Sequence, residues 1–123
     1  MQLKEIISLV EGKLLTDHYD QNEKIDGAMG ADLMSDVLAS ISPGAALLTG
    51  LCNPQVIRTA IIADIHAIIF VRGKQPEEET IDLANEENIS IITTNLGMFE
   101  ACGILYKAGM KSFEKQSLED FNT

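Results

Sequence analysis

The fold is decided by residues 45–95, which read AALLTGLCNPQVIRTAIIADIHAIIFVRGKQPEEETIDLANEENISIITTN. This stretch contains three short apolar runs, at residues 46–49, 67–71 and 89–93, which recur at an interval of about 22 residues. The runs are rich in β-branched residues and do not alternate with polar ones, which is typical of strands buried on both faces of a parallel sheet. The interval matches one strand plus one crossover helix. We therefore predict an α/β fold, a three-layer sandwich whose mostly parallel central sheet has a βαβαβ core flanked by helices.

Length and composition bound the organisation of the chain and its partners. The chain has 123 residues, 46% of them hydrophobic, which is enough for one core. We predict a single domain over residues 1–112, followed by a C-terminal tail over residues 113–123. The formal net charge of −10 disfavours nucleic acid as a partner, because binding to a phosphate backbone requires clustered Lys and Arg.

The sequence shows no targeting or metal-binding signal. No apolar run approaches the roughly 18 residues that a membrane span requires, and the first residues show no signal-peptide pattern. We therefore expect a cytoplasmic protein that does not bind a membrane. Cys52 and Cys102 show neither Cys-x-x-Cys redox spacing nor a zinc-binding pattern, so we expect two reduced thiols and no metal site.

Four elements are expected before the central stretch. A helix over residues 3–10 has apolar residues at helical spacing, with Gly12 as its left-handed stop. Strands are predicted at residues 13–16 and 24–31, and the glycines of the second strand either form a bulge or let another backbone come close. A second helix begins at Asp32, whose carboxylate caps the first turn. Its predicted apolar face consists of Leu33, Met34, Val37, Leu38 and Ile41.

Three further helices alternate with or follow the central strands. A helix over residues 54–65 begins with Asn53 as N-cap and a proline at its first position. The next helix carries acidic residues in its first turn and ends at Asn88, and the last one covers residues 98–108 and stops at Gly109. The tail beyond it either forms a short helix packed on the body or is frayed. The residues predicted to face the sheet from the first of these helices are Val56, Ile57, Ala60, Ile61 and Ile65.

Polar residues gather where the predicted parallel strands end. In a parallel sheet, ligands bind outside the carboxyl ends of the strands, near loops and helix N-termini. The hydroxyls, amides, glycines and cations found there suit a small anion or a nucleotide. The alternative interpretation is that these residues only form caps and turns, which use the same residue types. The predicted ligand-binding residues are Thr49, Gly50, Asn53, Arg72, Gly73, Thr94 and Asn95.

Phosphate-binding loops and catalytic sets are not found in the sequence. There is no Gly-x-x-x-x-Gly-Lys-Ser/Thr loop and no Gly-x-Gly-x-x-Gly. His18 and His66 have no acid or thiol at a helical spacing, and Ser35 has no paired histidine. Cys52, at a helix N-terminus, is interpreted as a turn residue, and Cys102, on an apolar helix face, as a core residue. We expect no catalytic residue and no cofactor.

Several segments, in their order and spacing, resemble the DRTGG domain. They are AMGADLMSDVL at residues 28–38, LTG at 48–50, AIIFVRG at 67–73 and IITTNLGMFE at 91–100. The resemblance extends over residues 3–112. It implies a fold similar to the N-terminal domain of HPr kinase/phosphorylase, without that enzyme's phosphate loop. Such domains occur as accessory modules beside CBS domains, in phosphotransacetylases and in some inorganic pyrophosphatases.

The chain departs from the residues that give this family its name. It has a Cys-Asn pair at residues 52–53 where the family pattern has Asp-Arg, and Val-Arg-Gly at residues 71–73 where the pattern has Thr-Gly-Gly. The strand end at residues 93–95 does match. The resemblance also implies a family motif made of Asp32, Ser35 and Asp36.

Three functional hypotheses follow. The first is a stand-alone, non-catalytic regulatory domain that forms a homodimer and senses a small anionic ligand, a nucleotide or a partner enzyme. The dimer is suggested by residues 27–30, whose glycines would let two backbones approach. The second hypothesis is a phosphotransferase or kinase related to HPr kinase, which the missing phosphate loop disfavours. The third is a pure protein-interaction scaffold.

Overall fold

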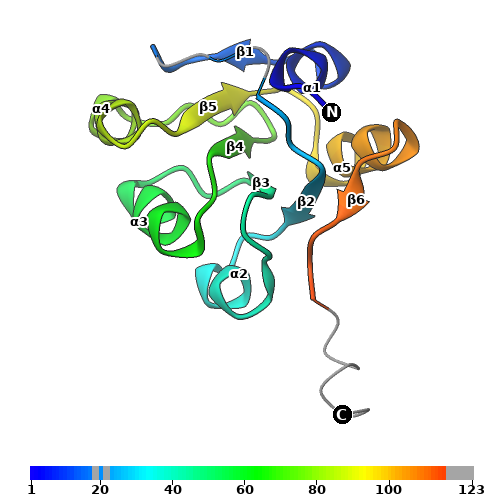
Figure 1. Cartoon of the computed structure of the whole chain (residues 1–123). Coiled ribbons are helices and arrows are strands. Elements are labelled where there is room, and N and C mark those ends of the chain that lie inside the picture. The colour runs from blue at the N-terminus through cyan, green and yellow to red at the C-terminus, as the bar shows by residue number, and fades with distance from the viewer. Residues whose placement is uncertain (18–19, 21–22, 116–123) are drawn as a thin grey trace.

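A six-stranded sheet forms the middle layer of the molecule (Figure 1). The computed structural model describes residues 1–17, 20 and 23–115, and within them the strand order is β1-β5-β4-β3-β2-β6. Strand β1 is antiparallel to β5, and every other pair of neighbours is parallel, which confirms the predicted mostly parallel sheet. The strands are β1 Lys13–Leu14, β2 Gly27–Gly30, β3 Ala46–Thr49, β4 Ala67–Phe70, β5 Ser90–Thr93 and β6 Lys111–Ser112.

The three strands predicted at the centre lie side by side. Strand β4 is paired with both β3 and β5, and Ile68 lies opposite Leu47 on one side and Ile91 on the other. Every residue of these strands is buried. A strand with both faces buried has no solvent-facing side, which explains why the three runs do not alternate apolar with polar residues.

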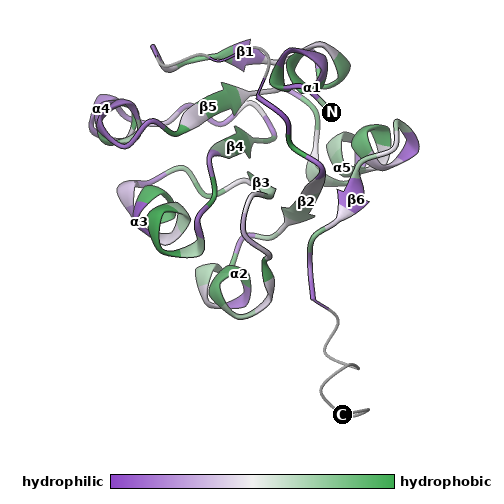
Figure 2. Ribbon diagram, viewed as in Figure 1, coloured by the Kyte–Doolittle hydropathy of each residue, from purple (hydrophilic) through white to green (hydrophobic). Residues whose placement is uncertain are grey.

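Helices cover both faces of this sheet (Figure 1). In Figure 2 the apolar colour is concentrated on β4 and β5, and the polar colour on α4 and β6. No helix among the described residues is long and apolar enough to cross a membrane. One face is covered by α2 Met34–Ser40, α3 Pro54–Ala63 and α4 Glu78–Glu86, and the other by α1 Leu3–Leu9 and α5 Met98–Lys107.

Each face of the sheet has its own apolar core. Successive strand residues point to opposite faces, so Ile68 and Phe70 belong to the core beneath α2, α3 and α4. Ile69 and Val71 belong to the core beneath α1 and α5. All four side chains are 0% exposed. Burying a side chain of this size contributes about 1.5–3 kcal/mol, so these two cores supply most of the stability.

Several predicted helix ends are confirmed. Asn53 is the N-cap of α3, where its side-chain oxygen accepts a hydrogen bond from the Gln55 backbone N–H at 3.1 Å. Asn88, after α4, has a φ of 56°, and Gly109, after α5, has a φ of 109°. Both residues adopt the left-handed conformation that commonly ends a helix.

Two other helices end at residues that the sequence did not indicate. After α1 the left-handed residue is Glu11, with a φ of 52°, and not the predicted Gly12. A Cβ on Gly12 would lie 2.6 Å from Ile92 Cγ2, so glycine is needed there for close packing against β5. Helix α3 stops short of residue 65 because Asp64 is left-handed, with a φ of 57°.

Helix α2 begins later than predicted. Its first residue is Met34, with Leu33 at the N-cap position, so the prediction that the helix begins at Asp32 is wrong. The Asp32 carboxylate accepts hydrogen bonds from residues at the end of β3 and not from the first turn of α2. A tertiary contact therefore takes the side chain that local sequence assigned to a cap.

The buried stripes of α2 and α3 are narrower than predicted. Met34, Val37 and Ile41 are buried as expected. Three predicted core residues lie at the surface, because helical spacing identifies an apolar side but not how much of it the neighbouring elements cover. They are Leu33, Leu38 and Ile61, which are 60%, 47% and 44% exposed.

Strand β2 lies in the interior of the sheet, between β3 and β6. Its backbone is therefore not free to pair with a second copy of the chain, and the predicted contact between two copies at residues 27–30 is wrong on this point. The position of a Cβ on Gly27 is occupied by the ring of Phe113. The glycine makes room for a side chain of the same chain. The homodimer itself stays a prediction.

The chain returns to the sheet after α5. Residues 111–112 form the edge strand β6, where the sequence predicted either a short helix or a frayed end. Beyond β6 the Phe113 N–H donates to the Ala28 carbonyl at 3.0 Å, and the Lys115 N–H donates to the Ser40 carbonyl at 2.7 Å. Residues 116–123 lie outside the described residues, and so does the predicted conformation of that part of the tail.

Replacing Gly103 with alanine should stabilise the protein. Gly103 lies inside α5 at the surface, and a Cβ there would have no heavy atom within 4 Å. The free energy of unfolding should rise by about 0.5–1 kcal/mol, because glycine is less favourable than alanine in a helix by that amount. Urea unfolding followed by circular dichroism measures this change. A lower midpoint would contradict the assigned helical turn.

Candidate functional site

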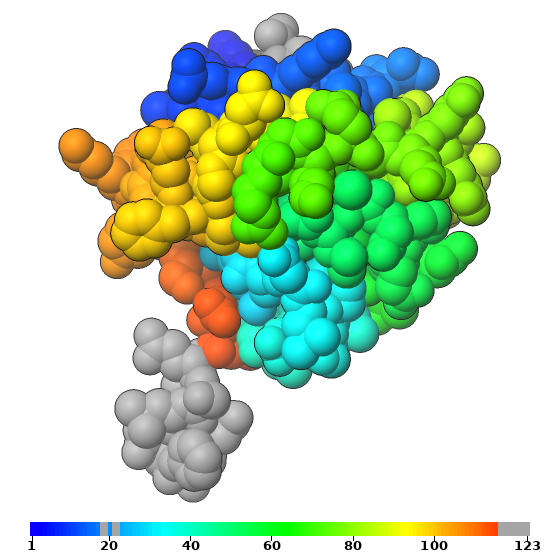
Figure 3. Space-filling view, turned by 180° about the vertical axis from the view of Figure 1, so that it is seen from behind, coloured from blue at the N-terminus to red at the C-terminus, as the bar shows by residue number. Residues whose placement is uncertain are grey.

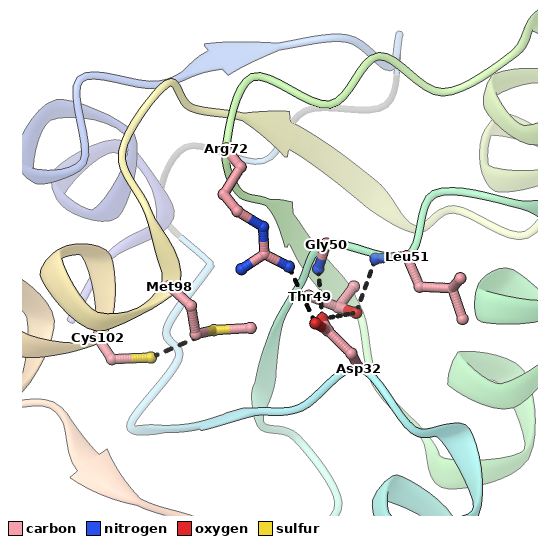
Figure 4. Close-up of polar contacts among 7 residues, drawn as sticks. All are labelled: Asp32, Thr49, Gly50, Leu51, Arg72, Met98 and Cys102. Carbon is pink, nitrogen blue, oxygen red and sulfur yellow. Dashed lines mark hydrogen bonds and ion pairs between the residues drawn. The ribbon is translucent and has the colours of Figure 1, made fainter.

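The carboxyl ends of β2, β3 and β4 bring together four residues that are distant in sequence (Figure 4). Asp32 follows β2, Thr49 and Gly50 lie at the end of β3, and Arg72 follows β4. Parallel strands end at the same edge of a sheet, so the topology alone places these residues near one another. We call the group formed by Thr49, Gly50 and Arg72 the strand-end site.

The strand-end site binds the carboxylate of Asp32. One carboxylate oxygen, Oδ1, accepts from the Gly50 backbone N–H at 2.7 Å and from the Thr49 hydroxyl at 3.2 Å. The other, Oδ2, accepts from Arg72 Nη2 at 2.9 Å. A main-chain N–H, a hydroxyl and a guanidinium thus converge on one anionic group, and bonds to an ionised group are the stronger kind.

The backbone after β4 fixes the position of Arg72. Arg72 has a φ of 61° and Gly73 a φ of 66°, and a left-handed arginine needs support from its surroundings. The support is two main-chain hydrogen bonds, from the Arg72 N–H to the Leu96 carbonyl at 2.7 Å and from the Gly73 N–H to the Thr94 carbonyl at 2.8 Å. The guanidinium then occupies the space that a side chain on Gly50 would fill.

Much of the guanidinium of Arg72 is still available. The side chain is 43% exposed, and Nη2 is bonded to Asp32. A guanidinium carries five N–H donors, and neither Nε nor Nη1 donates to any residue that the structure describes. The strand-end site therefore has donors to spare for a second oxyanion.

The contacts of Asp32 change its acidity. The hydrogen bond from the Gly50 N–H is the main cause that lowers the pKa of Asp32 below its usual value. Partial burial acts in the opposite direction, and the bonds from Arg72 and Thr49 add to the lowering. Asp32 is therefore ionised at neutral pH, as a ligand of this site must be.

An Asp32→Asn variant should show how this pKa is linked to stability. A group whose pKa is lower in the folded state stabilises the fold above its unfolded pKa, about 3.9 for Asp, and loses this contribution as pH falls through the folded pKa. The stability difference between the two proteins should thus be constant near neutral pH and shrink below about pH 3.9. Since the Asp32 side chain is 53% exposed, the difference should be small. Urea unfolding at a series of pH values measures it, and a difference that is independent of pH would contradict the assignment.

The predicted site residues separate into two groups. Thr49, Gly50 and Arg72 come together at the strand-end site, as predicted. Gly73 lies beside them in the loop, where a Cβ would be 3.0 Å from Asn95 Oδ1. These contacts bring residues from the ends of all three central strands to one edge of the sheet.

Two predicted site residues have structural contacts instead. Asn53 caps α3. Thr94 is 3% exposed, and its hydroxyl donates to the Val10 carbonyl at 2.6 Å and accepts from the Leu96 N–H at 3.2 Å. For Thr94 the cap-and-turn interpretation therefore fits the contacts better than ligand binding does.

The remaining candidates lie elsewhere or take other roles. His66 precedes β4, at the opposite edge of the sheet, and its Nε2 lies 2.9 Å from Asp64 Oδ1. His18 lies outside the described residues. Cys52 Sγ contacts the Gln75 carbonyl at 3.8 Å. Over the described part of the chain, no group of three or more His, Cys, Asp and Glu side chains could hold a metal ion.

The sequence-based reasoning missed that Asp32 is the partner of Arg72. The family resemblance singled out Asp32 together with Ser35 and Asp36, but the residues themselves were interpreted as helix cap and helix surface. The missing step was to treat β2 as another parallel strand whose end lies at the same edge. Ser35 is exposed on α2, and Asp36 lines the same polar hollow as Asp32.

The fold and the strand-end site define an α/β domain with a parallel sheet and an oxyanion-binding group at its carboxyl edge. The chain matches the DRTGG domain family over residues 5–108, and it belongs to that family. No curated protein matches it.

A solved structure shares this fold. It contains the CBS and DRTGG domains of the regulatory region of Clostridium perfringens pyrophosphatase, complexed with the activator diadenosine tetraphosphate. The TM-score is 0.74 and the sequence identity is 18%, so the likeness shows the fold. The match covers 98% of this chain and 57% of that chain.

Proposed function

We propose that this chain is a non-catalytic regulatory domain that senses a small anionic ligand, a nucleotide or a phosphorylated metabolite, at the strand-end site. The ligand's phosphate takes the place of the Asp32 carboxylate on Gly50, Thr49 and Arg72. Asp32 and the start of α2 then change their contacts, and a partner enzyme reads that change.

The observation that carries this proposal is the bound carboxylate of Asp32. It shows which chemistry the site accepts, because a phosphate oxygen uses the same N–H, O–H and guanidinium donors as a carboxylate oxygen. Asp32 is half exposed and lies in the segment between β2 and α2, so replacing it requires no opening of either core. The exposed donors of Arg72 provide the first contact for an incoming phosphate.

The comparisons support the regulatory part of the proposal. The solved neighbour is a regulatory region, and its ligand is a nucleotide that activates a pyrophosphatase. That region is much longer than this chain, so nucleotide binding by this chain rests on the strand-end site and not on the likeness.

Calorimetric titration with ATP and with inorganic tripolyphosphate tests the proposal. Both should bind the unmodified protein, and an Arg72→Gln variant should bind them at least about tenfold more weakly, because a hydrogen bond to a charged group is worth about 1.5–3 kcal/mol. Arg58→Gln is the matched control. It removes the same charge from an exposed position on α3, far from the strand-end site in the fold.

Two results would contradict the proposal. One is the absence of binding by either compound to the unmodified protein at low salt. The other is an equal loss of affinity in the Arg72 and Arg58 variants, which would show an effect of net charge alone.

We also propose that the chain acts as a homodimer. Since β2 is not free to pair, the contact is assigned to the exposed apolar side chains of α2 and α3, two helices that lie against each other. Ile62 on α3 is 73% exposed and Leu38 on α2 is 47% exposed, and such neighbouring side chains are typical of interaction surfaces. An Ile62→Asp variant should be monomeric by light scattering where the unmodified protein is dimeric, and a monomer in both cases would contradict the assembly.

A further inference from the structure

A second binding feature lies beside the strand-end site, between α5 and β2. On this face of the sheet β2 presents only Ala28 and Gly30, whereas the neighbouring β3 presents Leu48 beneath α5. The small side chains leave a pocket of about 400 Å³, which we call the α5 pocket. This volume is in the range of small-molecule sites. Figure 3 shows this side, with α5 in yellow to orange above the segment of β6 in orange-red.

The outer rim of the α5 pocket is aromatic. Phe99 and Tyr106 both line it, and they are 92% and 72% exposed. They are seven residues apart on α5, which is two helical turns, so they lie on the same side of the helix. Gly103, between them, adds no side chain to the rim. Two aromatic faces are thus left uncovered on either side of an opening.

The walls of the pocket are apolar and rich in sulfur. Met98, Cys102 and Met110 line it, and Cys102 Sγ lies 3.7 Å from Met98 Sδ (Figure 4). Burial raises the pKa of Cys102, so its thiol is neutral and adds no charge to the pocket. Thioether and thiol sulfur atoms make favourable contacts with aromatic rings.

The α5 pocket adjoins the strand-end site. Met29, Gly30, Ser112 and Glu114 line both the pocket and a polar hollow of about 800 Å³ beside α2, and Asp32 also lines that hollow. Gly30 and Asp32 are two residues apart, which is about 7 Å in extended chain. Asp32 in turn contacts Arg72, and Figure 4 shows Met98 reaching from α5 toward the same region.

We propose that the α5 pocket binds the base of a nucleotide whose phosphate lies at the strand-end site. This inference rests on the proposed function and adds the class of ligand. A flat ring fits between the sulfur-rich walls and stacks on the exposed aromatic side chains. The ribose crosses Gly30, where a larger residue would collide, since even a Cβ would lie 2.9 Å from Cys102 Sγ and 3.0 Å from Met98 Sδ.

The test compares inorganic phosphate, adenosine and adenosine 5′-monophosphate as probes. The monophosphate should bind at least about tenfold more tightly than inorganic phosphate, because a base stacked on an aromatic side chain adds affinity of this order. A Phe99→Ala, Tyr106→Ala double variant should lose this advantage and keep its affinity for phosphate. Both side chains are exposed, so the variant should fold normally. Gly103→Ala, a small change on the same helix, is the control for effects on α5.

Methyl resonances of the methionines report where the base lies. Adenosine and the monophosphate should shift the signals of Met98 and Met110, which line the pocket, and leave Met34 unchanged, because Met34 lies in the core on the other face. An Arg72→Gln variant should keep the adenosine shifts and lose phosphate affinity.

The outcomes separate the two proposals. Phosphate binding without any preference for the monophosphate, or without shifts at Met98 and Met110, overturns the base pocket and leaves the anion sensor in place. Adenosine shifts without phosphate binding overturn the anion sensor and keep the pocket for a base. A change of sedimentation in the double variant, with its nucleotide affinity unchanged, overturns the base pocket in favour of a second copy on this surface.

Discussion

Replacing Phe70 with alanine is expected to lower the free energy of unfolding by about 3–5 kcal/mol. Phe70 lies on β4, the strand between β3 and β5, and is 0% exposed. Its ring packs in the core beneath α2, α3 and α4. The loss combines the transfer of a large apolar side chain with the cavity left behind, and it is a large part of the roughly 5–15 kcal/mol that a domain has. Urea unfolding followed by circular dichroism measures the change.

Phe99→Ala is the matched control for this prediction. The substitution is chemically the same, but Phe99 is 92% exposed on α5, so stability should change by no more than about 0.5 kcal/mol. A loss for Phe99→Ala as large as that for Phe70→Ala would contradict the assignment of which aromatic side chain is in the core.

Replacing Thr94 with valine is expected to cost about 1–3 kcal/mol of stability. Valine keeps the shape of threonine but removes the buried hydroxyl. The Val10 carbonyl and the Leu96 N–H then lose their partner, and a buried polar group left unpaired carries this cost. Because Thr94 does not face the strand-end site, ligand affinity should be unchanged. Chemical unfolding and calorimetric titration of the same variant check both statements.

Thr80→Val gives the opposite result if this reasoning is right. Thr80 is also fully buried, but its hydroxyl has no hydrogen-bond partner among the described residues. Replacing it with a methyl group removes an unpaired polar atom, so the protein should become no less stable. Equal destabilisation by the two threonine substitutions would show that packing, and not hydrogen bonding, decides both.

The central part of the fold could be predicted because its signals are local. The buried runs at β3, β4 and β5 and the spacing between them identify the strands and their crossover helices without tertiary information. The Asn53 cap and the left-handed Gly109 are also local, since they depend on the conformation of one or two residues. These features agree between sequence and structure.

The candidate site could be predicted only in part, because its decisive contacts are tertiary. Strand-end reasoning identified Gly50 and Arg72, but nothing local shows that the Asp32 carboxylate lies between them. Thr94 has the residue type of a ligand and faces the interior, a distinction that depends on α1 supplying the Val10 carbonyl. The exposure of Phe99 depends in the same way on how far α5 extends beyond β2.

The central claim is that an anionic ligand binds at the strand-end site. Thermal unfolding against a panel of adenine and guanine nucleotides and metabolite phosphates, at fixed pH and salt, tests it most directly. A ligand at about 100 times its dissociation constant adds roughly 2.7 kcal/mol, which should raise the midpoint by on the order of 10 °C for a chain of this size. We predict such a rise for at least one nucleotide, lost in Arg72→Gln and kept in Arg58→Gln. A flat panel, or a rise that survives Arg72→Gln, would contradict the claim.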